Sequence, residues 1–135
     1  MNEPNLHEVF NESYEFINRP ESNFYELFYD DFIGSSNDIQ NLFKNVDINK
    51  QKLMLRESIL YMMMFYSDKN YNPYFVSLAR KHKKMNVTDD MYTSFMDSLI
   101  TALSKSYPKF DKTCELAWRV LFAPGIEFMK HIDEK

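Results

Sequence analysis

Apolar residues recur through most of the chain at intervals of three and four, which is the spacing that places side chains on one face of an α-helix. The clearest case is Met91, Phe95, Leu99 and Leu103, which repeat every four residues. No segment of comparable length alternates strictly between apolar and polar residues, as a half-buried strand would. The pattern predicts seven helical segments, with apolar faces within residues 6–17, 24–32, 39–43, 55–66, 75–82, 91–103 and 116–121.

Helix-breaking and helix-capping residues separate these segments. Pro20 and Gly34-Ser35-Ser36-Asn37 end the first two, and Asp68-Lys69-Asn70 ends the long fourth one. Asn72-Pro73 is a standard start, because asparagine caps a helix and proline suits its first position. Other signals agree with these boundaries: Thr88 and Asp111 are placed to cap the last two helices, Pro108 separates them, and Pro124-Gly125 is expected to kink or interrupt the last one.

The composition supports one all-α domain over residues 1–135. The chain has 135 residues, of which 44% are hydrophobic, so it can bury a sizeable core. It contains only two glycines and five prolines, against twelve phenylalanines, nine tyrosines and nine methionines. Turn-rich sandwiches and barrels, and glycine-dependent nucleotide loops, are therefore disfavoured.

Charge and hydropathy argue against nucleic-acid and membrane partners. The formal net charge of −4 argues against a general nucleic-acid binder. The basic run from Arg80 to Lys84 is interpreted as a solvated helix face, with a phosphate-binding patch as the weaker alternative. The longest apolar stretch, Ile59 to Tyr66, is too short to cross a bilayer, and the amino terminus lacks the features of a signal peptide. We therefore predict a cytoplasmic protein without a membrane partner.

Few residues are candidates for chemistry. Cys114 is the one cysteine, which excludes an intrachain disulfide and a cysteine-rich metal site. Of the three histidines, only His82 falls on the apolar face of a well-defined helix, and no second histidine follows four residues later. A lone histidine on an apolar face is most often a hydrogen-bonded core residue. If His82 does bind a metal, a site with a single histidine ligand indicates haem.

Three segments then resemble one family. The segment LARKHKKMNVTDDMYTSFMDSLITAL (78–103) resembles the proximal region of globins, and LFYDDF (27–32) with Phe43 resembles the distal half of bacterial single-domain globins and of flavohaemoglobin haem domains. The resemblance continues to ELAWRVLFAPGIEFMK near the end of the chain. It implies a three-over-three globin fold that binds one haem b, with His82 as the proximal ligand of a five-coordinate iron.

On the distal side, the resemblance implies that the Tyr29 hydroxyl reaches the bound ligand and that Phe43 packs against the porphyrin. In the preferred register of the distal helix, Gln51 faces the ligand and Leu55 lies over the haem one turn later. A shifted register would instead place Asn49 or Lys50 at the mouth of the pocket.

On the proximal side, Tyr92 matches the aromatic residue that follows the histidine by ten positions, where flavohaemoglobin-like domains use a tyrosine to hydrogen-bond the imidazole. Leu78, Val87 and Phe95 would line the pocket. Core packing is the alternative explanation for these residues.

The resemblance implies that the protein binds a diatomic gas, either oxygen or nitric oxide. Nitric oxide dioxygenation is the enzymatic hypothesis, and it needs a separate reductase because nothing in the chain resembles a flavin or nicotinamide domain. The alternatives are a gas-sensing or ligand-storage module that signals to a partner protein, and a haem-free helical protein.

Overall fold

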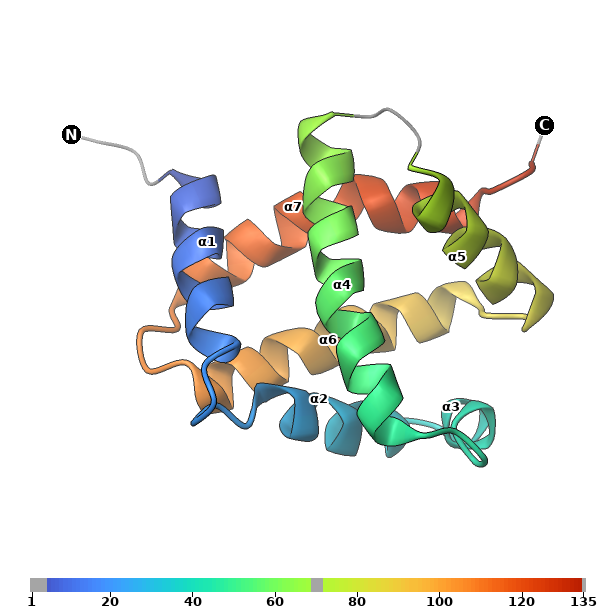
Figure 1. Cartoon of the computed structure of the whole chain (residues 1–135), viewed down its shortest axis with the longest axis horizontal. Coiled ribbons are helices and arrows are strands. Elements are labelled where there is room, and N and C mark those ends of the chain that lie inside the picture. The colour runs from blue at the N-terminus through green and yellow to red at the C-terminus, as the bar shows by residue number, and fades with distance from the viewer. Residues whose placement is uncertain (1–4, 69–71, 135) are drawn as a thin grey trace. The chain divides into compact units, whose positions relative to one another are not determined.

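A computed structural model describes residues 5–68 and 72–134 of the chain, and within them it contains seven α-helices and no strand (Figure 1). The prediction of an all-helical chain is confirmed for this part. The Lys69-Asn70 part of the expected stop after the fourth helix lies outside the described residues. In chain order the helices are α1 (Leu6–Ile17), α2 (Phe24–Ile33), α3 (Asn37–Leu42), α4 (Ile48–Ser67), α5 (Pro73–Lys84), α6 (Asp89–Ser106) and α7 (Lys112–Lys130).

The predicted capping residues do cap these helices. The Asn72 side chain accepts a hydrogen bond from the Tyr74 N–H at 2.8 Å, Thr88 Oγ1 accepts one from the Met91 N–H at 3.3 Å, and Asp111 accepts one from the Cys114 N–H at 2.8 Å. Each bond satisfies a donor that the first helical turn leaves unpaired.

Two helices extend beyond their predicted apolar faces. Helix α4 begins at Ile48, well before the apolar run at Leu55, because the Asp47 side chain accepts hydrogen bonds from the backbone N–H groups of Asn49 and Lys50. Helix α7 continues through Pro124, so of the two expected outcomes, a kink or an interruption, the interruption is wrong. Proline costs one backbone hydrogen bond in a helix interior, but the neighbouring Phe122 and Ile126 are buried and their packing offsets that loss.

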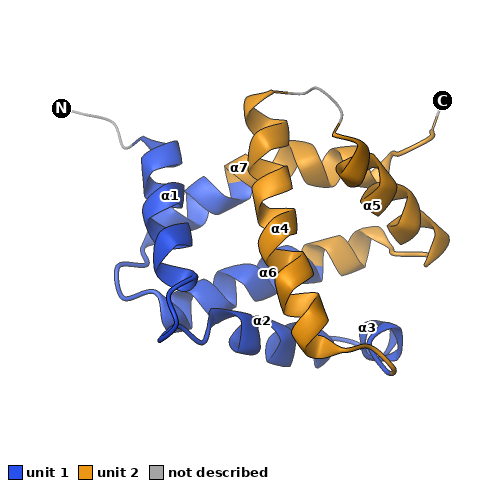
Figure 2. Cartoon of the chain, viewed as in Figure 1, with its two compact units in different colours: residues 1–44, 94–119 blue, residues 45–93, 120–135 orange. Residues whose placement is uncertain are grey.

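The chain divides into two compact units (Figure 2). Unit 1 comprises residues 1–44 and 94–119, and unit 2 comprises residues 45–93 and 120–135. Helices α6 and α7 each contribute to both units.

Unit 1 is organised around Trp118, which is fully buried. Its ring packs against Phe10 and Phe24, with centroid distances of 4.8 and 6.1 Å. The indole Nε1 donates a hydrogen bond to the buried Ser13 hydroxyl at 2.9 Å, and that hydroxyl donates to the Phe10 carbonyl at 2.8 Å. The polar atoms of this core are therefore paired, as burial requires.

Unit 2 packs three aromatic rings of α4, α5 and α7 together. Phe65, Phe75 and Phe128 lie with centroids 5.1 to 5.4 Å apart. Beside them, Gly125 of α7 lies directly against the Met62 side chain of α4, where a Cβ atom would collide with the Met62 sulfur. Glycine at position 125 therefore lets α7 and α4 approach closely.

No helix in the described residues is both long enough and apolar enough to cross a membrane.

Candidate functional site

His82 lies in the last turn of α5, a turn that also contains Lys81, Lys83 and Lys84. The His82 side chain is half-buried, and its Nδ1 atom is buried without a hydrogen-bond partner in the described part of the chain. Buried polar atoms are nearly always paired, so this ring nitrogen is available to a group from outside the described chain.

The imidazole is neutral at physiological pH. Burial, and secondarily the positive charge of Lys81, lower the pKa of His82 to about 4. A neutral imidazole has a lone pair on one ring nitrogen and is a metal ligand in that form. The described residues hold no group of three or more histidine, cysteine, aspartate or glutamate side chains placed to bind a metal ion. The donor at His82 therefore fits a metal that arrives with its other ligands, as haem iron does with its porphyrin.

The end of α5 fixes the neighbours of His82. Asn86 adopts a left-handed conformation (φ 60°), which asparagine tolerates better than most residues. This allows the Val87 N–H to donate a hydrogen bond to the His82 carbonyl at 3.1 Å. Val87 and Tyr92 both line a cavity of about 290 Å³ at the connection between α5 and α6. Leu78, one turn before His82, is half-buried.

The Tyr92 ring lies next to the His82 imidazole. The two ring centroids are 6.4 Å apart with an interplanar angle of 68°. Burial, and secondarily the charge of Asp89, raise the pKa of Tyr92 to about 12, so its hydroxyl stays protonated and can donate a hydrogen bond.

Tyr29, Phe43 and Phe95 gather in unit 1. The ring of Tyr29 meets that of Phe43 edge to face, with centroids 5.8 Å apart, and only 6% of Tyr29 is exposed. Burial raises the pKa of Tyr29 well above its usual value, which keeps the hydroxyl protonated. Phe28 and Phe32 connect this pair to Phe95 through edge-to-face contacts at 5.5 and 5.9 Å. The sequence indicated Phe28 and Phe32 as an apolar face, without this connecting role.

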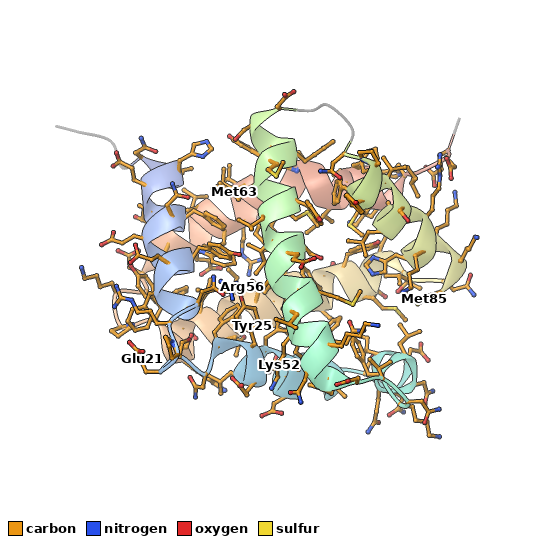
Figure 3. The ribbon with its side chains drawn as sticks, viewed as in Figure 1. Glu21, Tyr25, Lys52, Arg56, Met63 and Met85 are labelled. Carbon is orange, nitrogen blue, oxygen red and sulfur yellow. The ribbon has the colours of Figure 1, made fainter. Side chains whose placement is uncertain are left out.

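Leu55 and Gln51 lie one turn apart on α4. Leu55 is buried on the same face as Ile59 and Met62, and Gln51 is half-buried. Leu53, by contrast, is 62% exposed. The residues that directly follow Gln51 and Leu55, which are Lys52 and Arg56, are labelled along α4 in Figure 3.

The predicted residues divide between the two units. Tyr29, Phe43 and Phe95 belong to unit 1, and the remaining predicted residues belong to unit 2: Gln51, Leu55, Leu78, His82, Val87 and Tyr92. Sequence reasoning missed the pairing of Arg80 with Asp133, because 53 residues separate them and no sequence pattern links the two.

Comparison with known proteins identifies the class. The globin family profile matches residues 26–127, which is most of the chain. The chain belongs to the globin family. The predicted all-α globin fold is confirmed, and the family's general properties, binding of haem and of diatomic gases, apply to it.

A solved structure agrees. The crystal structure of a protein from Pseudomonas aeruginosa PAO1, described as structurally highly homologous to a human haemoglobin, aligns with a TM-score of 0.84 and 25% sequence identity. The alignment covers 93% of this chain and 96% of the Pseudomonas chain. The expected likeness to a bacterial globin is therefore confirmed. No curated protein sequence matches this chain significantly.

Proposed function

We propose that the protein binds one haem b through His82 and holds oxygen or nitric oxide beside Tyr29. The observation that carries this proposal is the buried Nδ1 of a neutral imidazole without a hydrogen-bond partner in the described residues, on the helix that matches the globin proximal region. Haem ligated by one histidine supplies an iron atom with one coordination position for a diatomic gas.

The proximal residues hold the imidazole. Tyr92 lies beside it and keeps a protonated hydroxyl, so we assign it the hydrogen bond that orients the ring. Leu78, Val87 and Phe95 supply apolar surface that excludes water from this side of the haem.

The distal residues act on the gas. A protonated Tyr29 hydroxyl donates a hydrogen bond to a ligand that carries partial negative charge, and Gln51 is proposed as a second donor. Phe43 and Leu55 are proposed to cover the porphyrin and keep water out. The assignment of these four residues to one distal pocket rests on their match to the globin sequence pattern.

Tight retention of oxygen suits nitric oxide dioxygenation better than release for transport. In that reaction, nitric oxide and oxygen combine with one electron to form nitrate. We propose that a separate reductase supplies the electron. A cytoplasmic location, which would give access to such a reductase, stays a prediction.

Haem reconstitution followed by a turnover assay tests the proposal. We expect the purified protein to take up one equivalent of haem with a sharp Soret band, and to consume nitric oxide continuously under oxygen only when a reductase and reduced nicotinamide cofactor are present. Haem uptake with a single stoichiometric round of consumption would instead assign the protein to gas sensing or storage. Failure to take up haem would contradict the whole proposal.

A further inference from the structure

The residues that follow α7 form a tight turn, residues 131–134. The Glu134 N–H donates a hydrogen bond to the His131 carbonyl at 3.1 Å, and His131 Nδ1 lies 2.7 Å from a Glu134 carboxylate oxygen. Asp133 adopts the left-handed conformation (φ 62°), and Ile132 is buried. Main-chain and side-chain bonds together therefore fix the shape of this turn.

This turn contacts α5 at two points on either side of His82 in the sequence. The Arg80 guanidinium donates two hydrogen bonds to the Asp133 carboxylate, from Nε at 3.0 Å and from the terminal nitrogen at 3.1 Å. Lys83 Nζ donates a hydrogen bond to the Ile132 carbonyl at 2.8 Å. All four residues belong to unit 2.

Helical geometry explains what these contacts do. Residues 80 and 83 are three apart, so their side chains emerge from neighbouring positions on one face of α5. At about 100° per residue, His82 points roughly 100–160° away from both. The turn therefore contacts the face of α5 that lies away from the imidazole, and leaves the imidazole free to bind a ligand.

We infer that the 131–134 turn is a clamp that sets the position of α5 and thereby of the His82 imidazole, with Arg80 and Asp133 as positioning residues. A bidentate arginine–carboxylate pair fixes direction as well as distance, which a single lysine contact does not. The consequence for haem iron rests on the proposed function, whereas the clamp itself is a property of the apoprotein.

The test must measure local changes in α5, because an exposed ion pair contributes little to global stability. Asp133→Asn is the suitable change: it removes the charge and one acceptor position, while asparagine tolerates the left-handed backbone. The matched control is Asp97→Asn, which removes the carboxylate from another exposed arginine pair, with Arg119 at 3.2 Å in unit 1.

In the apoprotein, we expect Asp133→Asn to speed amide hydrogen exchange in residues 81–84 about two- to fivefold and to shift the His82 ring resonances, with the melting midpoint nearly unchanged. Arg80→Gln should have the same effect, and the double variant should add nothing further. Asp97→Asn should leave residues 81–84 as in the wild type.

In the haem-loaded protein, the iron–histidine stretching band should shift in Asp133→Asn and not in Asp97→Asn. Unchanged exchange and ring signals in the apoprotein would overturn the clamp, whatever happens with haem. Equal acceleration throughout the chain would also overturn it, since that result indicates global destabilisation. If the apoprotein effects appear but no haem binds, the clamp stands and the proposed function fails.

Discussion

Burial shifts the pKa values of His82 and Tyr29 in opposite directions, and the physical cause is the same for both. Desolvation disfavours a charged side chain, so it lowers the pKa of the histidine to about 4 and raises that of the tyrosine. Both side chains are therefore neutral at physiological pH. A neutral imidazole can ligate a metal, and a neutral phenol can donate a hydrogen bond, which are the two roles proposed for them.

Replacing Tyr29 with phenylalanine should speed oxygen dissociation. The change keeps the ring and its contact with Phe43, but it removes the proposed hydrogen bond to a partly charged ligand, a type of bond worth about 1.5–3 kcal/mol. We expect the oxygen off-rate, measured by stopped-flow displacement, to rise about ten- to a hundredfold, and carbon monoxide release to change little.

Tyr25→Phe is the matched control, because the Tyr25 hydroxyl donates a hydrogen bond to Asn18 Oδ1 at 2.6 Å. Tyr25 is labelled in Figure 3. This variant should keep the wild-type oxygen off-rate. An unchanged off-rate in Tyr29→Phe would mean that the Tyr29 hydroxyl does not reach the gas.

His131 should titrate above its ordinary pKa of 6.5. Glu134 is the main cause and Glu127 the smaller one. Glu134→Gln should lower the pKa, measured from ring proton shifts, more than Glu127→Gln does. Because the folded-state pKa is raised, the interaction stabilises the protein fully below pH 6.5 and is lost as pH rises through the raised value. A pKa that does not respond to Glu134→Gln would contradict this assignment.

Individual residues show where sequence reasoning succeeds and where it stops. The sequence predicts that its one cysteine forms no intrachain disulfide, and Cys114 is a free, buried thiol whose pKa is raised to about 11, mainly by burial. The unpartnered Nδ1 of His82 has no sequence signal, because whether a ring nitrogen finds a donor depends on tertiary packing. The Arg80–Asp133 pair escapes prediction for the same reason.

At the scale of elements, local chemistry predicts most helix boundaries. Capping side chains act over two or three residues, so Asn72, Thr88 and Asp111 could be recognised from the sequence alone. The apolar face predicted from Leu55 marks only part of α4, because apolar periodicity does not mark the turns that follow the Asp47 cap. Pro124 does not interrupt α7, because burial of the surrounding residues overrides a local preference.

Gly125→Ala should destabilise the protein. Alanine favours a helix over glycine by about 1 kcal/mol, but its Cβ would collide with the buried Met62 side chain, and overpacking costs about 1–3 kcal/mol. We expect a net loss of about 1 kcal/mol in the free energy of unfolding, measured with urea.

A double-mutant cycle isolates this collision. In a Met62→Ala background the obstacle is gone, so adding Gly125→Ala should be neutral or stabilising. If Gly125→Ala costs the same in both backgrounds, the close approach of α7 to Met62 is not the cause.

At the scale of the whole molecule, the grouping of the helices in space does not follow from periodicity alone. Residues 94–119 join residues 1–44 in unit 1, and residues 120–135 join residues 45–93 in unit 2. Many helical arrangements satisfy the same amphipathic faces, so periodicity predicted the helical class without its topology. The resemblance of residues 27–32 and 78–103 to globins supplied the topology, and the family match confirms it.

Haem should stabilise the whole protein by mass action. Free haem at about a hundred times its dissociation constant adds about 2.7 kcal/mol, which corresponds to a rise of about 10 °C in Tm for a chain of this size. Circular dichroism melting with and without haem measures the rise. His82→Ala should lose most of it, and an equal rise in that variant would indicate binding that does not involve His82.

The central claim is that His82 is the haem ligand, and the most direct measurement is chemical rescue of His82→Gly. Removing the imidazole should abolish stoichiometric haem uptake and the sharp Soret band, and added imidazole should restore both by supplying the missing donor. His7→Gly and His131→Gly should keep the wild-type spectrum without added imidazole. Full haem retention and an unchanged Soret band in His82→Gly would contradict the account.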